Sequence, residues 1–477
     1  MKRTALTLAL AAMLGFPATG MAHDEFPVEL EQYLELLPGG VVPTALSHGA
    51  DEHSDNMFLV ANWADPDESG HSTYRQGSDL AFWGNVAVLG NYGAPGGFRL
   101  LDIENPAAPR ELGQFVCPGP QADVSIWKKL VFLSVDSPRS APECGAGAAS
   151  QVATTTGVGS YEGIRIVDIS NPASPTQIAF VDTDCGSHTH TLVPDEKNGR
   201  LLIYVLSYPL NPQGVDCNAE THRKISVVEV PLKAPARARV VSTPSVSPAI
   251  GCHDVTVDLD RKVAGAACIT ESQMWDISDP VNPVVISHIV NPQINIHHST
   301  TFSWSGNTLV VGDELGGAVA TPGCAGSDEH LPLGALWFYD VSKPAAPVVK
   351  GTFRIPQDEL SIFCTAHNFN VVPARSGRDV LVSAWYNGGT TVLDFTDPAN
   401  VEQIGFYLPK DGTLAAAWSS YWYRGFIYAN NFDEDVNSIS PHSRGLDVFA
   451  IGHPDLKDAI KVNRLNPQTI ERPASLN

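Results

Sequence analysis

The sequence predicts an all-β protein, a seven-bladed β-propeller with four-stranded blades, from three observations. A short apolar run that ends near an acidic residue and a proline recurs seven times, roughly 50 to 65 residues apart. Short β-forming runs with turn residues between them fill the intervals. No interval holds a long segment with the 3.6-residue apolar period of a helix. Because a lone sheet cannot bury both faces, we expect the units to stack around an axis.

The repeat is clearest at residues 101–106, which read Leu-Asp-Ile-Glu-Asn-Pro. Its acidic residue falls at a strand end before a turn, where a carboxylate caps backbone N–H groups. Five copies keep the pattern well, whereas the third and the seventh keep it loosely. The seven copies lie at residues 99–109, 164–175, 227–231, 274–283, 338–347, 392–398 and 448–454.

The fifth unit shows the expected strands best. Residues 299–303 and 308–312 are β-forming runs, and the turn Ser305-Gly306-Asn307 separates them. After a long polar insertion, residues 335–341 and 348–353 form a second pair around the proline-rich turn 344–347. Each unit therefore predicts four short strands.

The two ends of the chain differ from the repeats. Residues 1–22 have a basic start, an apolar run and small residues before His23, which predicts a secretory signal peptide. Residues 23–55 read as an irregular segment, residues 56–455 as the propeller, and residues 456–477 as a tail that packs loosely over one face. Residues 57–63 resemble a lone strand, and we expect this strand to complete the last blade and close the ring.

Composition places the protein outside the cytoplasm and away from nucleic acid. The net charge of −22 repels nucleic acid and anionic lipid. No segment has the roughly 18 apolar residues of a membrane span. Because residues 1–22 predict export, we expect a periplasmic or extracellular protein. Eight cysteines in such a compartment predict four disulfides, and sequential pairing is the simplest assignment: Cys117–Cys144, Cys185–Cys217, Cys252–Cys268 and Cys324–Cys364.

Histidines recur near the start of the first strand in four consecutive units. His190, His253, His298 and His367 share one register when the units are aligned by the following turn. His188 precedes His190 by two residues and points to the same side of that strand. The neighbouring His297 is expected to point the other way. Since the first strand of a blade lines the central channel, we expect these imidazoles to converge at its mouth.

Such a cluster predicts a transition-metal site. Imidazole is the commonest metal-binding side chain, and three or four imidazoles with an open position suit a catalytic metal. Copper and zinc fit this ligand set equally well. Asp313 and Glu314 end a neighbouring strand, where either can orient an imidazole or act as a base. The alternatives are a polar channel lining and direct binding of an anionic ligand.

Aromatic residues of the last two units are candidates for a pocket wall at the same end. The alternative is ordinary packing between blades. These residues are Trp385, Tyr386, Trp418, Tyr421, Trp422 and Tyr423.

Residues 166–172 and 275–280, which read Ile-Val-Asp-Ile-Ser-Asn-Pro and Trp-Asp-Ile-Ser-Asp-Pro, resemble the LVIVD repeat of secreted bacterial β-propellers. The histidine segments 187–191, 252–254, 297–299 and 367–368 resemble those of one subgroup, and residues 418–430 are a further match. Together with the repeats, the resemblance spans roughly residues 75–455. It implies the fold and supplies no reaction. A more distant resemblance is to the selenium-binding protein and methanethiol oxidase family, whose propellers have channel-facing histidines and whose oxidase is exported and copper-dependent. That family's selenium-binding cysteine region has no clear counterpart here.

Two functional hypotheses follow. In the first, His190, His253, His298 and His367 hold one metal that binds a small-molecule substrate, and His188 is either a fifth ligand or a donor that orients one; oxidation is the reaction class considered. In the second, the protein is a non-catalytic binding or adhesion module of the cell envelope that recognises ligands through its insertions.

Overall fold

The computed structural model describes residues 33, 36–37, 51–64, 77–92, 95–119, 121–145, 160–209, 217–314, 324, 333–358, 364–410, 415–433 and 445–472. The expected signal peptide and most of residues 23–55 lie outside this set. The described chain is all-β, and its helical elements are short: η2 (Glu196–Asn198), α4 (Ala219–His222) and η3 (Pro235–Arg237). The all-β fold class is therefore confirmed.

Five sheets of the described chain are each built on four strands that are consecutive in sequence, as the repeat predicts. In each sheet the first two strands pair antiparallel across a short connection. The strands are β3 (Gly77–Trp83), β4 (Val86–Asn91), β5 (Phe98–Asp102) and β6 (Arg110–Phe115); β7 (Val124–Trp127), β8 (Leu130–Val135), β9 (Gly163–Asp168) and β10 (Thr176–Asp182); β11 (Thr189–Asp195), β12 (Arg200–Leu206), β13 (Ser226–Pro231) and β14 (Arg239–Ser242); β15 (Asp254–Asp258), β16 (Val263–Ala267), β17 (Ser272–Asp276) and β18 (Val284–Ile289); and β19 (His297–Phe302), β20 (Thr308–Asp313), β21 (Leu336–Asp340) and β22 (Val348–Phe353).

The remaining units share one nine-stranded sheet. Its strand order is β1 (Glu52–His53), β26 (Glu402–Leu408), β25 (Gly389–Asp394), β24 (Val380–Tyr386), β23 (Thr365–Val372), β27 (Ala415–Tyr423), β28 (Phe426–Asp433), β29 (Gly445–Ile451) and β2 (Met57–Trp63). The two halves join where β23 and β27 pair in parallel. As expected, the N-terminal strand β2 pairs with β29 as an outer strand. The count of seven separate blades stays a prediction.

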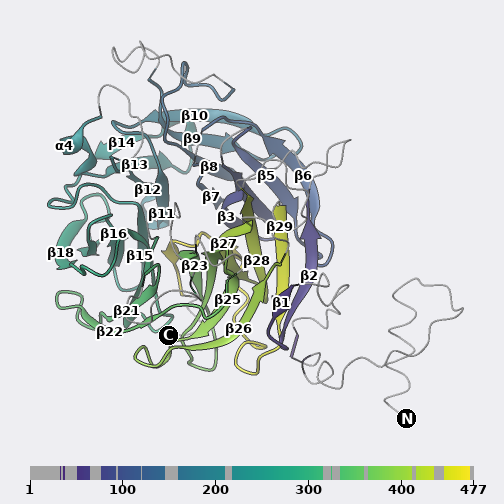
Figure 1. Cartoon of the computed structure of the whole chain (residues 1–477). Helices are drawn as coiled ribbons and strands as arrows, with labels where there is room; N and C mark the ends of the chain where they lie inside the picture. Colours follow the sequence, from purple (N-terminus) through teal and green to yellow (C-terminus); the bar gives the residue numbers. More distant parts are fainter. Residues whose placement is uncertain are drawn as a thin grey trace, which may run out of the picture.

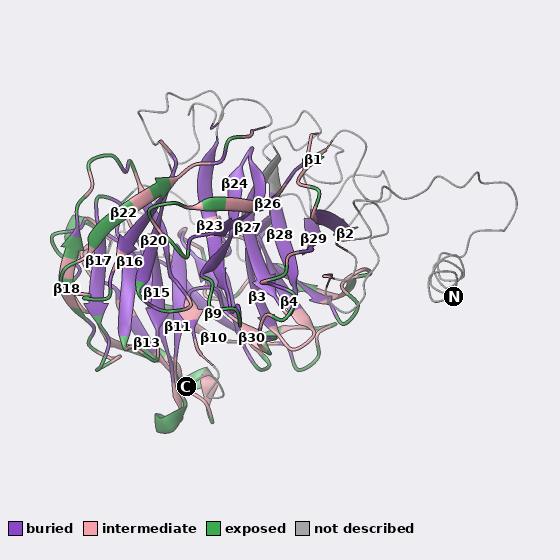
Figure 2. Ribbon diagram, turned by 90° about the horizontal axis from the view of Figure 1, so that it is seen from below, coloured by how far each residue is buried: buried purple, intermediate pink, exposed green. Residues whose placement is uncertain are grey.

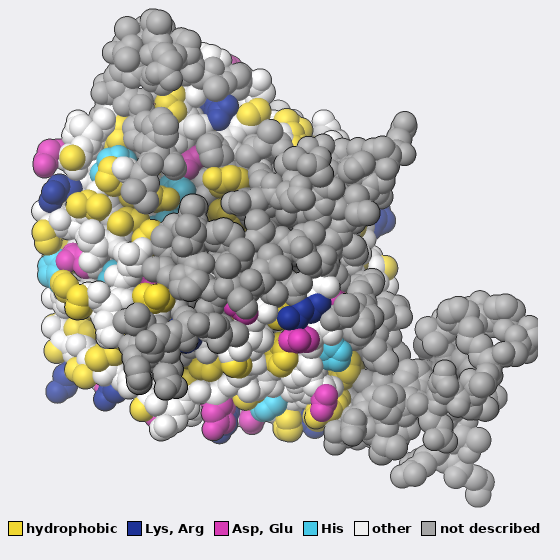
Figure 3. Space-filling view, viewed as in Figure 1, with side chains coloured by type: hydrophobic (Ala, Val, Ile, Leu, Met, Phe, Trp, Pro, Cys, Tyr) yellow, Lys and Arg dark blue, Asp and Glu magenta, His cyan; other side chains and the backbone are white. Residues whose placement is uncertain are grey.

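The sheets are arranged around a centre, and the first strand of each repeat unit is innermost (Figure 1). These strands include β3, β7, β11, β15, β23 and β27. Inner strands such as β15 and β19 are buried along their whole length, whereas outer strands such as β18 and β22 expose alternate or successive residues (Figure 2). Apolar burial between neighbouring sheets is thus the main stabilising contribution. Basic, acidic and apolar side chains are interspersed on the surface seen in Figure 3.

The acidic residue of the repeat caps the turn that follows it. The Asp168 carboxylate accepts the backbone N–H of Ser170 at 2.7 Å. Equivalent bonds, each to the backbone N–H two residues on, are made by Asp102, Asp276, Asp340 and Asp394. The structural role expected for this position is therefore confirmed.

Polar side chains also link the first strands of neighbouring sheets. Each side chain donates to a backbone carbonyl on, or next to, the first strand of the following unit. The series begins at β3, passes through each unit in turn and returns to β3 from β27. The bonds are Ser78 Oγ to Ala122 O (2.9 Å), Thr191 Oγ1 to Val255 O (2.5 Å), Thr256 Oγ1 to Thr300 O (2.5 Å), Ser299 Oγ to His367 O (3.0 Å), Asn370 Nδ2 to Trp422 O (3.1 Å) and Ser419 Oγ to Ser78 O (2.9 Å). Between β7 and β11, the His190 backbone N–H donates to Asp123 Oδ2 at 2.7 Å.

The C-terminal segment is bound far more tightly than the expected loose tail. Within it, β30 (Arg464–Leu465) pairs with β3, and β31 (Thr469–Ile470) pairs in parallel with β15. The Asn466 side chain bonds both backbone groups of Ile126 at 2.8 and 3.0 Å, and Arg472 binds both carboxylate oxygens of Asp258. The segment therefore crosses the C-terminal ends of β3, β7 and β15, and these hydrogen bonds hold it there.

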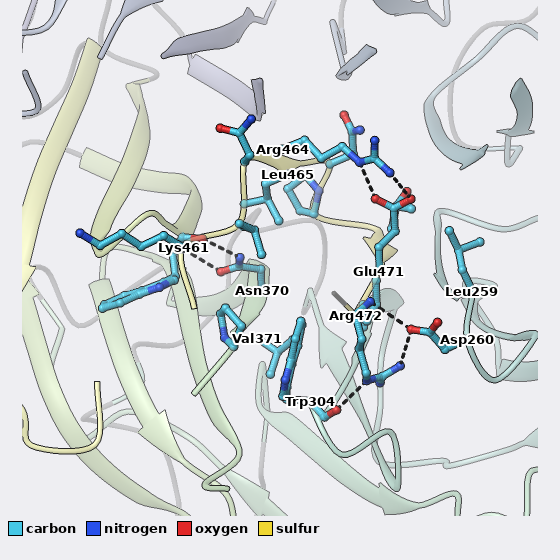
Figure 4. Close-up of a pocket in the computed structure, with 18 of the residues that line it drawn as sticks. Leu259, Asp260, Trp304, Asn370, Val371, Lys461, Arg464, Leu465, Glu471 and Arg472 are labelled. Carbon is cyan, nitrogen blue, oxygen red and sulfur yellow. Dashed lines mark hydrogen bonds and ion pairs between the residues drawn. The ribbon is translucent and has the colours of Figure 1, made fainter. Parts of the chain in front are cut away.

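A cavity of about 610 Å³ lies between this segment and the strand ends (Figure 4). Among its charged lining groups, Arg464 binds Glu471, and Arg472 binds Asp258 and Asp260. Trp304 also lines this cavity.

All four disulfides have the predicted sequential pairing. Four disulfides indicate an oxidising compartment, outside the cell or in the periplasm. Among the described residues, the structure has no helix long and apolar enough to cross a bilayer.

Candidate metal centre

Four imidazoles from four neighbouring first strands form one continuous arc. Ring centroids are 4.6 Å apart between His188 and His253, 3.8 Å between His253 and His298, and 4.4 Å between His298 and His367. All four side chains are buried. The predicted convergence of histidines at the channel is thus found for these four.

The inner nitrogens of the arc approach one another. Nε2 of His188 lies 3.0 Å from Nε2 of His253. Two nitrogens that bind one ion at 2.0–2.1 Å lie about 2.9 Å apart at a right angle and about 3.4 Å apart in a tetrahedron. The observed separation therefore suits two ligands of a single ion.

Hydrogen bonds on the other ring nitrogens orient two of the imidazoles. Nδ1 of His188 lies 2.8 Å from the Asp136 carboxylate, and Nδ1 of His367 donates to the Trp418 carbonyl oxygen at 2.5 Å. With the proton on Nδ1, the lone pair of Nε2 faces the centre of the arc. This is the outer-shell arrangement typical of histidine ligands.

Local backbone irregularities aim the last two rings. The β19–β20 register shifts between His297 and Ser299, and the β23–β24 register shifts between Ala366 and Phe369. His298 and His367 therefore lie at bulges, which turn a side chain away from simple alternation. His297 points away, as expected, and its Nδ1 lies 2.8 Å from Ser272 Oγ.

Glu314 completes the cluster on the side of His298 and His367. Its carboxylate oxygens lie 3.6 Å from Nε2 of His298 and 3.7 Å from Nε2 of His367. These three donor atoms all lie within 4.8 Å of one another. Nε2 of His367 has no hydrogen-bond partner among the described residues.

Asp313 does not take part in this cluster. Its Oδ1 accepts the backbone N–H groups of Asn295 and Ile296 at 3.0 Å, and its Oδ2 accepts that of Gly334 at 3.1 Å. The expectation that Asp313 acts as a base is therefore not supported, because both of its carboxylate oxygens accept backbone N–H groups.

His190 is separated from the arc, which corrects the predicted register. The backbone N–H of His188 donates to Leu206 as that of His253 donates to Ala267, so His188 is the true equivalent of His253. His190 follows two residues later, about 6.6 Å further along the strand. Its Nε2 lies 2.6 Å from Ser125 Oγ, and its Nδ1 lies 2.8 Å from Ser134 Oγ and 2.9 Å from Asp123 Oδ2.

Tyr208 is a neighbour that sequence reasoning missed. Its hydroxyl lies 3.1 Å from Nε2 of His188, and its ring lies 4.6 Å from that of His188. The residue follows β12 at the start of an insertion, and the sequence carries no signal for its direction.

Only part of the predicted aromatic wall lies here. Tyr386 stacks on His367 and Trp418 meets it edge-on, each at 4.6 Å, while Tyr92 lies 5.2 Å from Trp418. The other predicted wall residues pack in hydrophobic cores between sheets instead: Trp385, Tyr421, Trp422 and Tyr423.

Burial sets the charge state of the cluster. It lowers the pKa of His367 to about 3 and, with the neighbouring imidazoles, lowers the pKa of His253 and His298 well below the usual value. Burial also raises the pKa of Glu314 to about 8, and the Asp313 carboxylate adds to this shift. These three imidazoles are therefore neutral at pH 7, which is the form that binds metal.

A second buried polar group lies in the channel beyond the imidazoles. Tyr421 donates to Asp79, and Gln468 of the C-terminal segment donates to the same carboxylate at 3.1 Å. Burial and the charge of Asp123 raise the pKa of Asp79 well above its usual value, and the same causes raise the pKa of Asp254 to about 8.

Cys185, Cys217 and His222 also lie close together. The two cysteines form a disulfide, so their sulfurs are not thiolates and the group is unsuited to metal binding.

Comparisons with known proteins agree on the repeat and give no reaction. The LVIVD repeat model matches residues 158–183, a region that includes β9. No curated protein matches the sequence, and no match supports the resemblance to selenium-binding proteins.

Solved structures of 902 chains are similar to this fold. A chain of Kuenenia stuttgartiensis hydrazine synthase is 13% identical with a TM-score of 0.49, covering 86% of this chain and 100% of that one. A functionally unknown protein from Desulfotomaculum acetoxidans is 10% identical with a TM-score of 0.45, covering 69% and 84%. The computationally designed Ika8 protein is 10% identical with a TM-score of 0.42, covering 79% and 83%. Fold similarity of this kind does not identify a reaction.

Proposed function

We propose that this protein is an exported metalloprotein whose transition-metal centre lies at one end of a propeller channel. His188, His253, His298, His367 and Glu314 are the proposed ligands. The observation that carries the proposal is the arc of four buried imidazoles, two of which, His298 and His367, have Nε2 atoms within 3.7 Å of the Glu314 carboxylate. Without metal, the raised pKa keeps most Glu314 side chains protonated at pH 7, and a bound cation would stabilise the carboxylate form that ligates it.

We further propose that the scaffold has seven blades. Division of the nine-stranded sheet at the short β23–β27 pairing gives two units with the strand order of the other five. The bonds between first strands support this division, because they pass through β23 and β27 in the same way as through the separate sheets.

Nitrogen and carboxylate donors suit copper, zinc and iron, so the donor set does not choose among them. Tyr208 and the aromatic group Tyr92, Tyr386 and Trp418 flank the ligands, which supports a small-molecule ligand at an open metal position. Oxidation of that molecule remains a prediction that depends on a redox-active metal.

Elemental analysis of protein purified from an exported fraction tests the metal centre. We expect about one transition-metal ion per chain, lost in the His253→Ala, His298→Ala double variant. The matched control is His288→Ala, because that imidazole lies on the exposed outer strand β18 and binds Glu271. Metal-free wild-type protein that stays metal-free after dialysis against copper, zinc or iron would support the binding-module alternative.

A further inference from the structure

We infer that three disulfides and the Asp313 carboxylate are positioning groups that hold the four imidazoles in place before metal binds. The inference rests on the proposed metal centre. Its starting point is that a cross-link precedes each ligand strand at nearly the same place.

The disulfides lie directly before three of the imidazoles. Cys185 precedes His188 by three residues, Cys252 is adjacent to His253, and Cys364 precedes His367 by three residues. Their partners, Cys217, Cys268 and Cys324, lie on insertions or on a neighbouring strand end. Each bridge therefore fixes the point at which a ligand-bearing strand begins.

The strand that carries His298 has no cysteine before it, and Asp313 takes that place. By accepting the N–H groups of Asn295 and Ile296, its carboxylate fixes the backbone just before His298. By accepting the N–H of Gly334, it also fixes a residue whose carbonyl accepts the backbone N–H of Ala366, next to His367.

Hydrogen bonds to the backbone connect these cross-linked strand starts to one another. Ile269, next to Cys268, pairs with His297 through N–H···O bonds of 2.9 and 3.1 Å. Thr189 donates to the backbone carbonyl of His253, and Ser299 donates to that of His367. A displacement of one strand start would therefore be resisted by its neighbours.

Such connected cross-links reduce the entropic cost of ordering the ligand strands when metal binds. A strand end that frays has to be ordered when metal binds, and this cost weakens affinity. Removing groups that orient metal ligands typically weakens affinity by about 10- to 100-fold. We expect an effect of this size when one cross-link is removed.

The test is a Zn²⁺ titration of the full mature protein against a chromophoric chelator, with circular dichroism to verify folding. Cys252→Ala, Cys268→Ala and, separately, Asp313→Asn are expected to bind Zn²⁺ about 10- to 100-fold more weakly than wild type. The matched control is Cys117→Ala, Cys144→Ala, which removes a disulfide that precedes β7, a strand without any of the four imidazoles. This control is expected to keep wild-type affinity.

Equal affinity of folded wild type, control and both test variants overturns the inference while the metal centre stands. Equal weakening in the control also overturns it, because general loosening would then explain the effect. Absence of Zn²⁺, copper and iron binding in wild type overturns the proposed function itself. If the double cysteine variant does not fold, the Asp313→Asn variant decides alone.

Discussion

Single residues decide which histidines form the site. His188 and His190 lie on the same side of one strand, yet only the first reaches the arc of imidazoles. The second bonds Ser125, Ser134 and Asp123, and it thereby links two sheets. A shift of two residues along a strand is enough to separate a proposed ligand from a residue that links two sheets.

Substitution of His190 should therefore affect stability and leave metal content intact. His190→Ala removes the imidazole that bonds the buried Asp123 carboxylate and two hydroxyls, so we expect a loss of about 1–3 kcal/mol in the free energy of unfolding. Urea unfolding measures the loss, and elemental analysis measures the metal. Loss of metal in a folded variant would restore His190 to the ligand set.

The buried acid Asp254 should make metal-free protein less stable as pH rises. Its pKa is about 8 when folded and near 3.8 when unfolded, so the native state binds more protons between these values. Stability accordingly falls from about pH 4 to about pH 8. Melting temperatures between pH 5 and 8 should decline less steeply in Asp254→Asn than in wild type or in the exposed control Asp397→Asn. Parallel slopes in all three proteins would contradict this.

At the scale of elements, the C-terminal segment acts as a clamp across the far ends of the first strands. Asn466 satisfies both backbone groups of Ile126, while β31 extends the sheet of β15. The imidazoles lie near the opposite ends of these strands. Stability and metal binding should therefore respond differently to changes in this segment.

Asn466→Ala should lower the free energy of unfolding by about 1–3 kcal/mol, because it leaves a buried N–H and C=O unpaired. Metal affinity should not change. The exposed Asn463, in the same segment, provides the matched control as Asn463→Ala. Chemical denaturation of the three proteins measures the difference, and equal stability of both variants would argue against the clamp.

At the scale of the whole molecule, β2 from the N-terminal part of the described chain completes the edge of the last repeat unit at β29. β2 pairs with β29 through six residue pairs and covers what would otherwise be an open edge. An exposed edge strand invites pairing with other chains. The ring therefore depends on a strand far from its partner in sequence.

Removal of residues 1–63 should expose β29 and cause association or aggregation. The comparison is a chain that begins at residue 23 and keeps β1 and β2. Size-exclusion chromatography and thermal unfolding test this expectation. A monomeric, equally stable truncated protein would show that β2 does not close the fold.

The sequence alone determined the repeating all-β architecture, the turn-capping role of residues such as Asp168, the closing strand and the disulfide pairing. These features follow from local patterns and from neighbours in sequence. It also pointed to the histidines, because four fell near strand starts. Only the tertiary structure showed that His188 takes the place expected of His190 in the arc of imidazoles. It also showed that Asp313 accepts backbone N–H groups while Glu314 faces the imidazoles, and that the C-terminal segment crosses the opposite ends of the inner strands. Strand register, bulges and contacts between sheets set these outcomes, and none of them is encoded within a single repeat.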